Sequence, residues 1–345
     1  MKELPAIFQD GERTYFADTC EPLKAAAANG ELQLHAWGHA LYPGVLLPHS
    51  CLPAVRSVGV WDAPVGQSWG LDRHCNEGIE FTYLKRGKTA FEVDGGHWTL
   101  RKGCLTITRP WQFHRVGAPH VGAGRLTWLI LDVGVRRPNQ TWHWPEWLVC
   151  SQAELQKLTR LLSHNEQPVW QAGAEVERWF DTLAGLLEEE GDPSAGESRL
   201  KLAMNGLLLA VLELLEHEHI PLDEYLSTTE RAVQMFLAAL PQHAASDWDL
   251  TAMAHQCGLS RSQFSEYCRQ LTNMTPMQYL THCRVEMAAT MLANRPDTTI
   301  TEVAYACGFN SSQYFATVFR SVKGCTPSAF AHTAGLRSVA WSTAA

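Results

Sequence analysis

Hydrophobic and polar residues alternate over short runs in the first part of the chain. Phe81–Leu84 and Thr89–Val93 are two such runs, and the dipeptide Asp94-Gly95 follows the second. Asp-Gly beside alternating hydrophobic residues is a strong signal for a β-hairpin turn, and closely spaced hairpins are typical of barrels and double-sheet jelly rolls. The pattern therefore predicts a β-barrel or jelly-roll domain over residues 1–150.

From Ser151 onward, hydrophobic residues recur at intervals of three and four positions, which predicts helices. We expect a helical middle region over residues 151–222. Nearly every position from Leu200 to Leu215 is hydrophobic. A helix of that kind is normally buried on all sides, so we expect it to contact its own chain on one side and a partner chain on the other. An ordinary core helix within one domain is the alternative.

The strongest pattern lies near the end of the chain. Ile300 and Val303 belong to one hydrophobic helix face, and Gly308 then suits the left-handed position that ends a helix. Asn310 or Ser311 can cap a following helix. This second helix is expected to bury four side chains, at Tyr314, Phe315, Val318 and Phe319. Two short helices joined in this way predict a helix-turn-helix unit, whose second helix enters the DNA major groove.

The same unit occurs a second time. At an offset of 50 positions, identical residues stand at Thr251, Ala254, Cys257, Gly258, Ser262 and Gln263 and at Thr301, Ala304, Cys307, Gly308, Ser312 and Gln313. Between the two units, Pro276–Asn294 predicts one helix, which would be about 27 Å long at about 1.5 Å per residue. This length is near the roughly 34 Å of a DNA turn. We therefore expect both second helices to enter successive major grooves.

The later unit resembles the signature of AraC/XylS-type transcriptional regulators. The matching residues are Ile300, Glu302, Val303, Ala304, Gly308, Phe309, Ser311, Tyr314, Phe315, Phe319, Arg320, Gly324, Thr326, Pro327 and Phe330. Ala331 departs from the pattern, because the family often has arginine there. The resemblance implies an all-α domain with two helix-turn-helix units over 226–333. The expected fold class is α+β multidomain, with a tail over 334–345 that we expect to be disordered.

Carried over position by position, the resemblance implies a set of DNA-facing side chains. Base edges would be met mainly by Ser262, Ser265, Glu266, Ser312, Gln313 and Thr317, phosphates by Arg261, Arg269 and Arg320, and the set also includes Gln263 and Ser311. Glu266 would either accept a hydrogen bond from cytosine or pair with Arg269. For each of these residues, a plain solvent-exposed role is the alternative.

The net charge of −8 argues against a nucleic-acid-binding protein until it is divided along the chain. Residues 151–244 contain 6 Lys/Arg against 16 Asp/Glu, whereas residues 245–345 contain 7 against 6. The acidity therefore lies in the middle region. Because the last part is nearly neutral rather than basic, helix N-termini and hydroxyl groups would supply part of the phosphate contacts. We expect modest non-specific affinity for DNA.

The β-rich part carries a resemblance of its own. The motif order from Gly87 to His114 resembles the cupin-like sensor of AraC-type regulators. His74-x-Asn76-x-x-x-Glu80, followed by His114, resembles the cupin metal pattern with Asn76 in place of a second histidine. Asparagine is a poor ligand for a transition metal, so we expect no metal and no other cofactor. The two histidines would then hydrogen-bond a small ligand or be ordinary polar residues at the barrel mouth.

Nine of the 13 tryptophans lie before residue 150. An indole offers a flat apolar face and one donor, which suits stacking on the C–H faces of a sugar. We expect a ligand pocket formed by Arg73, His74, Glu80, Trp111, His114 and Trp128. This set suits a neutral polyol, and a monosaccharide is the leading hypothesis because some relatives in the family bind sugars. A carboxylate held by Arg73 is one alternative, and core packing is another for each tryptophan.

Composition bears on the cellular compartment. The ten cysteines form no C-x-x-C pairs, and the first residues lack the pattern of a signal peptide. No stretch approaches the roughly 18 uninterrupted apolar residues of a membrane span. These features predict a cytoplasmic protein with reduced thiols and no membrane association.

Together, the patterns predict a ligand-responsive, sequence-specific transcriptional regulator that is not an enzyme. Its expected partners are double-stranded DNA, a small-molecule effector and a second copy of the chain, with RNA polymerase as a further candidate. Two other interpretations stay open: a metal-binding cupin enzyme fused to a DNA-binding domain, and a constitutive DNA binder with an inert β domain. The sequence leaves open the effector, the operator, the choice between activator and repressor, and which region forms the dimer.

Overall fold

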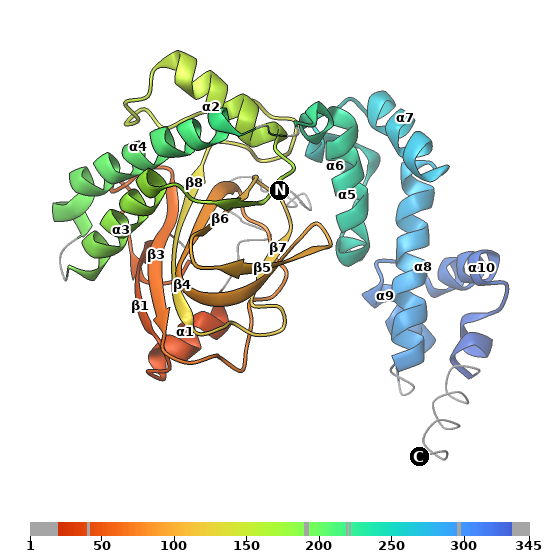
Figure 1. The fold of residues 1–345 in the computed structure, drawn as a ribbon. Helices are drawn as coiled ribbons and strands as arrows, with labels where there is room; N and C mark the ends of the chain where they lie inside the picture. The colour runs from red at the N-terminus through yellow and green to blue at the C-terminus, as the bar shows by residue number, and fades with distance from the viewer. Residues whose placement is uncertain are drawn as a thin grey trace. The chain divides into compact units, whose positions relative to one another are not determined.

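The computed structural model describes residues 20–39, 42–189, 193–218, 220, 222–294 and 298–332 (Figure 1). The chain divides into two compact units, with the boundary between Thr228 and Thr229. In the part that is described, the first unit combines a β-sheet with helices, and the second contains helices alone. This confirms the predicted α+β class. The tail expected over 334–345 lies outside the described residues.

Nine strands of the described chain join one sheet in the order β2-β1-β3-β8-β4-β6-β9, and β5 and β7 both pair with β4. The strands are β1 (Gln33–Gly38), β2 (Val45–Leu46), β3 (Val55–Ala63), β4 (Gly78–Val93), β5 (Gly96–Arg101), β6 (Cys104–Thr108), β7 (His114–Val116), β8 (Gly124–Asp132) and β9 (Val169–Gln171). β1 and β2 run parallel, and the other pairs are antiparallel.

The long strand β4 pairs with two different sets of strands along its length. Its first half pairs with β6 and β8, whereas its second half pairs with β5 and β7. The strands therefore curve around a common interior, as Figure 1 shows. At the end of β4, Asp94 and Gly95 have φ values of 46° and 82°, and Val93 pairs with Gly96. A two-residue loop with both φ values positive is the hairpin turn predicted for Asp94-Gly95.

The first unit also contains helices. They are α1 (Glu21–Ala28), α2 (Gln152–His164), α3 (Ala174–Glu188), α4 (Pro193–His217) and the short 3₁₀ helix η1 (Glu224–Ser227). Of these, α3 contacts the sheet directly and α4 packs on α3. α3 packs on the outer face of the sheet, where the rings of Tyr83 and Phe180 stack with centroids 5.3 Å apart. Lys85 of β4 also pairs with Glu177 at 2.6 Å and Asp181 at 2.8 Å. These helices lie in the same compact unit as the sheet.

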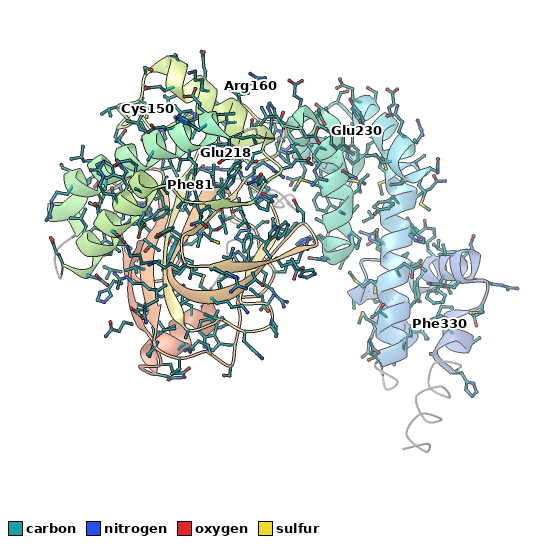
Figure 2. All side chains as sticks on the ribbon, viewed as in Figure 1. Phe81, Cys150, Arg160, Glu218, Glu230 and Phe330 are labelled. Atoms are coloured by element: carbon teal, nitrogen blue, oxygen red, sulfur yellow. The ribbon has the colours of Figure 1, made fainter. Side chains whose placement is uncertain are left out.

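Side chains alternate between the two faces of the sheet, as strand geometry requires. Along β4, Phe81 and Tyr83 are buried, and Tyr83 stacks on α3 (Phe81 is labelled in Figure 2). Glu80 and Thr82, on the opposite face, line a cavity in the interior. The interior core includes Trp61, Leu84, Phe91, Trp128 and Ile130. The alternation therefore places a carboxylate and a hydroxyl inside a largely apolar interior.

Helix α4 is buried over most of its circumference and exposed along one side. Leu200, Leu207 and Val211 are buried, whereas Leu202 is 67% exposed and Leu209 is 37% exposed. The prediction that one side contacts the chain's own fold is therefore met. Contact of the other side with a partner chain stays a prediction.

The second unit contains α5 (Thr229–His243), α6 (Leu250–Gln256), α7 (Arg261–Thr272), α8 (Pro276–Asn294), α9 (Ile300–Ala306) and α10 (Ser312–Lys323). The long helix α8 packs against α5 and α7 and also against α9 and α10 (Figure 1). Its buried residues Val285, Ala288 and Leu292 join Phe315 and Phe319 of α10 in one core. The helix predicted over Pro276–Asn294 therefore connects the two helical pairs.

The burial predicted for α10 is correct at two positions and wrong at one. Phe315 and Phe319 are fully buried, and Val318 is half-buried. Tyr314, however, is 58% exposed. Phe309 is buried against Phe315, with ring centroids 5.0 Å apart, and Tyr314 covers this pair from outside at 6.2 Å from Phe309. The core beneath the first turn of α10 is therefore filled from the preceding loop, which leaves Tyr314 at the surface.

Candidate functional site

The two short helical pairs of the second unit share one turn geometry. The amides of Leu259 and Phe309 donate to the carbonyls of Ala254 and Ala304, each at 2.9–3.0 Å. The preceding glycines, Gly258 and Gly308, have φ values of 67° and 82°. A left-handed residue followed by such a bond ends a helix and redirects the chain. The duplication predicted at an offset of 50 residues is therefore present in the backbone itself.

Serine caps fix the first turns of α7 and α10. The Ser260 hydroxyl accepts from the amide of Gln263, and the Ser311 hydroxyl accepts from the amide of Tyr314 at 3.1 Å. Of the two caps predicted for α10, the structure therefore selects Ser311 over Asn310. The side-chain oxygen of Gln263 in turn accepts from the amide of Ser260 at 3.2 Å and from its hydroxyl at 2.8 Å. Gln263 is thus oriented toward the helix cap, which sequence reasoning did not foresee.

The outer face of α7 carries most of the side chains predicted to meet DNA. Arg261, Ser262, Gln263, Glu266 and Arg269 are exposed, and Ser265 is half-buried. No ion pair joins Glu266 to Arg269 in the part of the chain that the structure describes. Contact of Glu266 with a base and a plain solvent-exposed role both stay predictions.

On α10, Gln313, Thr317 and Arg320 are exposed, and Ser311 and Ser312 are half-buried. The Thr317 hydroxyl donates to the carbonyl of Gln313 at 3.0 Å, one turn earlier on the same helix. The first turn of α10 also presents the exposed ring of Tyr314. Tyrosine hydroxyls are common donors to phosphate oxygens. Sequence reasoning missed Tyr314 because its helical position was assigned to the core.

A cavity of about 50 Å³ lies in the interior that the curved β-sheet of the first unit encloses, and we name it the barrel cavity. Its polar lining residues include His74, Asn76, Glu80 and Thr82, and the apolar wall includes Trp128. The Trp128 indole N–H donates to the Ser57 hydroxyl at 2.9 Å, so the ring contributes its apolar surface to the cavity. Thr82 could have been found from the sequence, because it lies two positions after Glu80 on the same strand face.

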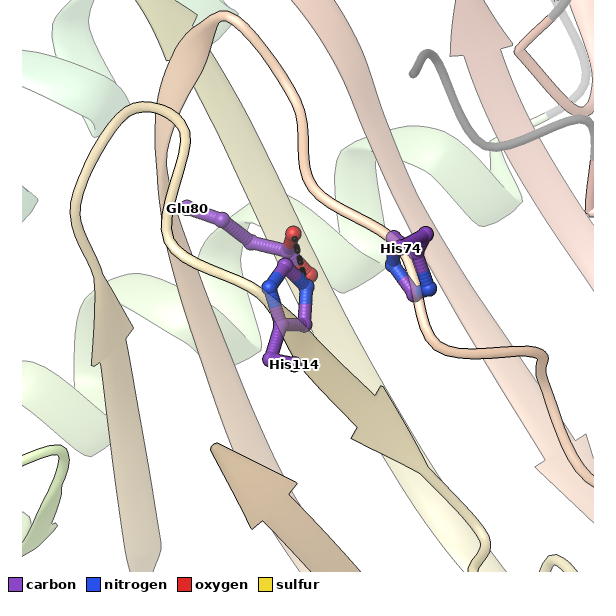
Figure 3. A group of neighbouring side chains, drawn as sticks. All are labelled: His74, Glu80 and His114. Carbon is purple, nitrogen blue, oxygen red and sulfur yellow. Dashed lines mark hydrogen bonds and ion pairs between the residues drawn. The ribbon is translucent and has the colours of Figure 1, made fainter. Parts of the chain in front are cut away.

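Three residues of the predicted pocket form a cluster: His74 before β4, Glu80 on β4 and His114 on β7 (Figure 3). The backbones of His74 and His114 exchange two hydrogen bonds, at 2.8 and 3.0 Å, and their rings meet edge to face at 4.3 Å. Nε2 of His114 lies 3.1 Å from Oε2 of Glu80. Burial alone would raise the pKa of Glu80, but the charges and hydrogen bonds of His114, His74 and Thr82 lower it to about 2.

Three of the six predicted pocket residues do not line the cavity: His114, which contacts Glu80 instead, and Arg73 and Trp111, which lie elsewhere. Arg73 is exposed, and its guanidinium stacks over the ring of Phe113 at 4.2 Å. Trp111 is 1% exposed, and its indole N–H donates to the carbonyl of Val135 at 2.9 Å. Trp111 also has a φ of 65°, in the left-handed region that residues other than glycine rarely adopt. None of the three residues lines the cavity, so their prediction as pocket residues is corrected.

The cluster has donor types that suit a metal ion. One ring nitrogen of His74, one of His114 and one carboxylate oxygen of Glu80 lie within 4.8 Å of one another. Two imidazoles and one carboxylate form a familiar metal-binding set. The Nδ1 atoms of His74 and His114 contact the carbonyls of Asp72 and Gln112 at 2.7 and 2.9 Å. Because carbonyls only accept, Nδ1 carries the proton and Nε2 remains the ligand atom.

Asn76 does not supply a further ligand in this arrangement. Its Nδ2 donates to Oε2 of Glu80 at 2.8 Å, and its Oδ1 accepts from the amide of Gly78 at 3.1 Å. Both ends of the carboxamide are therefore engaged. The cluster therefore fits a metal site with three protein ligands. The same geometry also fits an ion pair between a protonated imidazole and a carboxylate, without a metal.

Comparison with known families gives two matches. A helix-turn-helix domain family matches residues 253–333, which contain α7 to α10. A cupin domain family matches residues 59–130, which contain β4 to β7. In the described residues, we find no helix long and apolar enough to cross a membrane.

Curated relatives include the HTH-type transcriptional activator RhaS of Escherichia coli O1:K1 / APEC. It is 34% identical over 133 residues, which are 39% of this chain and 45% of that protein. RhaS of Escherichia coli strain SE11 is 29% identical over 151 residues, or 44% of this chain and 52% of that protein. The chain spans about half the length of the curated relatives it matches.

Among solved structures, the DNA-binding domain of AdpA in complex with a target DNA is 30% identical, with a TM-score of 0.29. The match covers 30% of this chain and 94% of the AdpA domain. ToxT from Vibrio cholerae O395 is 10% identical, with a TM-score of 0.31, and the match covers 88% of this chain and 98% of ToxT.

Proposed function

We propose that this chain, an AraC/XylS-type protein in which a cupin domain precedes a double helix-turn-helix domain, is a sequence-specific DNA-binding transcriptional regulator. The observation that carries the proposal is the repeated turn at Gly258 and Gly308, each followed by a capped helix with an exposed polar face. Such a helix presents hydroxyl and amide groups that can read base edges in a major groove.

The exposed faces of α7 and α10 are suited to different contacts. Gln313 can bond adenine through two hydrogen bonds, and Glu266 can accept from the amino group of cytosine. Arg261, Arg269 and Arg320 would contact phosphates. Because the second unit is nearly neutral, we expect hydroxyl groups such as that of Tyr314 to supply part of the phosphate contacts.

The remaining parts of the proposal concern partners. A second copy of the chain would allow binding to two DNA half-sites. The exposed apolar residues of α4, Leu202 and Leu209, are candidates for the contact between the two copies. RNA polymerase is a further candidate partner, and activation is the outcome that the name of RhaS suggests. The proposed location is the cytoplasm.

The effector is proposed to be a sugar or a related small polar molecule bound by the first unit. His74, Glu80 and Trp128 line the barrel cavity, and Nε2 of His114 contacts the carboxylate of Glu80. At about 10–15 Å³ per water molecule, however, 50 Å³ is enough for only a few waters. A monosaccharide in this cavity would therefore require its walls to move.

The proposal is tested by selecting DNA sequences from a random library with the full chain and measuring affinity by fluorescence anisotropy. We expect one enriched motif with two separate conserved parts, one for each helix-turn-helix unit. Specific sites should bind at least about a thousandfold more tightly than random DNA at physiological salt. Equal affinity for all sequences, with the same salt dependence, would overturn the proposal.

A second candidate is a metal-binding cupin enzyme fused to a DNA-binding domain, and the cluster of His74, Glu80 and His114 favours it. It requires stoichiometric metal, so elemental analysis of purified protein that finds none would dismiss it.

A third candidate is a constitutive DNA binder with an inert β domain. Thermal-shift screening distinguishes it from a ligand-responsive regulator. A ligand that binds the folded state raises the melting temperature by mass action, whereas an inert β domain would give no shift with any sugar or acid.

A further inference from the structure

A second and larger hollow lies in the first unit, between α2 and the loop that follows β8. We name it the α2 groove and define it by Trp142, Trp144, Gln156, Arg160, His164 and Ser227. We propose that the α2 groove binds a sugar that carries a carboxylate or a phosphate, and that the bound anion acts on the segment leading into α5. The inference rests on the proposed regulatory function and gives it a ligand site and a ligand class.

The α2 groove and the barrel cavity differ in size. The α2 groove has a volume of about 660 Å³, whereas the barrel cavity has about 50 Å³. Small-molecule sites usually measure about 300–1,000 Å³. The α2 groove can therefore accept a ligand of monosaccharide size without rearrangement, and the barrel cavity cannot.

The charge of the lining favours an anion. Arg160 projects from α2 and is exposed (Figure 2), and among the described residues no carboxylate forms an ion pair with it. His143 and His164 add two imidazoles, and no Asp or Glu belongs to the described lining. A guanidinium binds a carboxylate or a phosphate through two parallel hydrogen bonds.

The remaining lining favours a polyhydroxylated body. The rings of Trp142 and Trp144 lie 5.7 Å apart at 57° to each other, and both are half-exposed. The Trp144 indole N–H donates to the Thr159 hydroxyl at 2.8 Å, which fixes this ring against α2. Gln152 and Gln156 lie one turn apart on α2 and are exposed. Aromatic faces stack on sugar C–H groups, and carboxamides both donate to and accept from hydroxyls.

One end of the groove touches the segment that joins the two units. Nε2 of His164 lies 2.9 Å from the Ser227 hydroxyl, and the amide of Asp223 donates to the His164 carbonyl at 2.8 Å. η1 ends at Ser227, and α5 begins at Thr229. A ligand that shifts His164 or Ser227 therefore acts on the backbone that leads directly into the DNA-binding unit.

The first experiment measures binding to the full chain by calorimetry and tryptophan fluorescence. The probes are glucuronate, gluconate and glucose 6-phosphate, with glucose, acetate and inorganic phosphate as partial ligands. We expect saturable binding of a sugar anion, and the carboxylate and phosphate probes show which anion the site prefers. Arg160→Gln should weaken binding at least about tenfold, because it removes a charged hydrogen-bond donor. Arg199→Gln, an exposed arginine elsewhere in the unit that pairs with Glu189, should leave binding unchanged.

A barrel variant decides which hollow is occupied. Trp128→Phe alters the wall of the barrel cavity and should leave sugar-anion binding intact, whereas Trp142→Ala should weaken it. Binding that is lost in Trp128→Phe and retained in Arg160→Gln would overturn the proposal. So would the absence of binding for every probe up to about 10 mM, a concentration that fills even a millimolar site.

The second experiment concerns the link to DNA. With the DNA motif selected as above, a bound sugar anion should change operator affinity in the unaltered chain. Asp223→Ala removes the side chain that caps η1 and lies outside the groove lining, so it should still bind the anion but lose most of that change. Anion binding without any effect on operator affinity would overturn the link to α5. Sequence-selective DNA binding is measured without ligand. Its absence would contradict the proposed regulatory function, whereas the absence of anion binding would contradict only the α2 groove.

Discussion

Nε2 of His114 lies 3.1 Å from Oε2 of Glu80, while Nδ1 of the same ring contacts the carbonyl of Gln112 at 2.9 Å. The carbonyl accepts a hydrogen bond, so Nδ1 carries a proton. An unprotonated Nε2 and a carboxylate would then face each other as two acceptors. A proton or a cation between them removes this conflict, and the interior of the barrel therefore carries a paired charge.

His114→Ala should lower the free energy of unfolding by about 3 kcal/mol, as expected when one partner of a buried ion pair is removed. The measurement is urea denaturation of the full chain, followed by tryptophan fluorescence. His74→Ala is the matched control, because His74 is only half-buried and should cost less. Equal losses for the two variants would contradict a specific pairing between His114 and Glu80.

Asp132 predicts an acid-sensitive component of stability. Burial raises its pKa, but Arg136, at 2.8 Å, and Arg56, at 2.5 Å, outweigh burial and lower it. A group with a lowered folded-state pKa stabilises the fold above its unfolded pKa, near about 3.9, and loses this effect as pH falls through the folded value. Asp132→Asn should therefore destabilise at neutral pH and flatten the acid limb of a stability–pH curve below about pH 4. The exposed Asp72→Asn serves as control, and an unchanged acid limb in Asp132→Asn would contradict the assignment.

Two glycines of the second unit should respond unequally to alanine. Gly308 has a φ of 82°, and an added Cβ would lie 2.6 Å from the Ala245 carbonyl oxygen. Gly324 has a φ of 75° and nothing within 4 Å of an added Cβ. Gly324→Ala should cost about 1 kcal/mol from left-handed strain alone. Gly308→Ala adds a backbone clash and should cost about 3 kcal/mol or more. Thermal denaturation measures both, and similar melting temperatures would show that the turn can shift to relieve the clash.

Gln313 and Gln263 occupy matching positions in the two helix-turn-helix units but should differ in role. Gln313→Ala should weaken binding to the selected operator by about 1–3 kcal/mol and relax preference at one base pair. Gln263 accepts from both the amide and the hydroxyl of Ser260 at its own helix cap, whereas Gln313 accepts from the Ser311 hydroxyl at a longer 3.3 Å, so Gln263→Ala should affect stability more than base preference. Anisotropy against operators changed one base pair at a time provides the comparison. An equal loss for Gln313→Ala on all sequences would count against direct reading of a base.

Local chemistry in the sequence was enough to predict many elements. The Asp94-Gly95 hairpin, a cap at Asn310 or Ser311 and the repeated glycine turn each depend on a few neighbouring residues, and each is present, with the cap at Ser311. Tyr314 was assigned wrongly because periodicity defines the face of a helix but not what fills the core beneath it. Trp111 was assigned wrongly because its ring is buried and bonds the carbonyl of Val135, 24 positions away, which its neighbours in sequence do not identify.

The sequence by itself therefore determined the α+β class, the paired helices and part of the cavity lining, namely His74, Glu80 and Trp128. Turn, cap and periodicity signals depend on residues that are close neighbours along the chain. Only the tertiary structure decided which polar groups meet. The contact of Glu80 with His114 spans 34 positions, and that of His164 with Ser227 spans 63. Contacts across such separations depend on how strands and helices pack, and no local pattern specifies them.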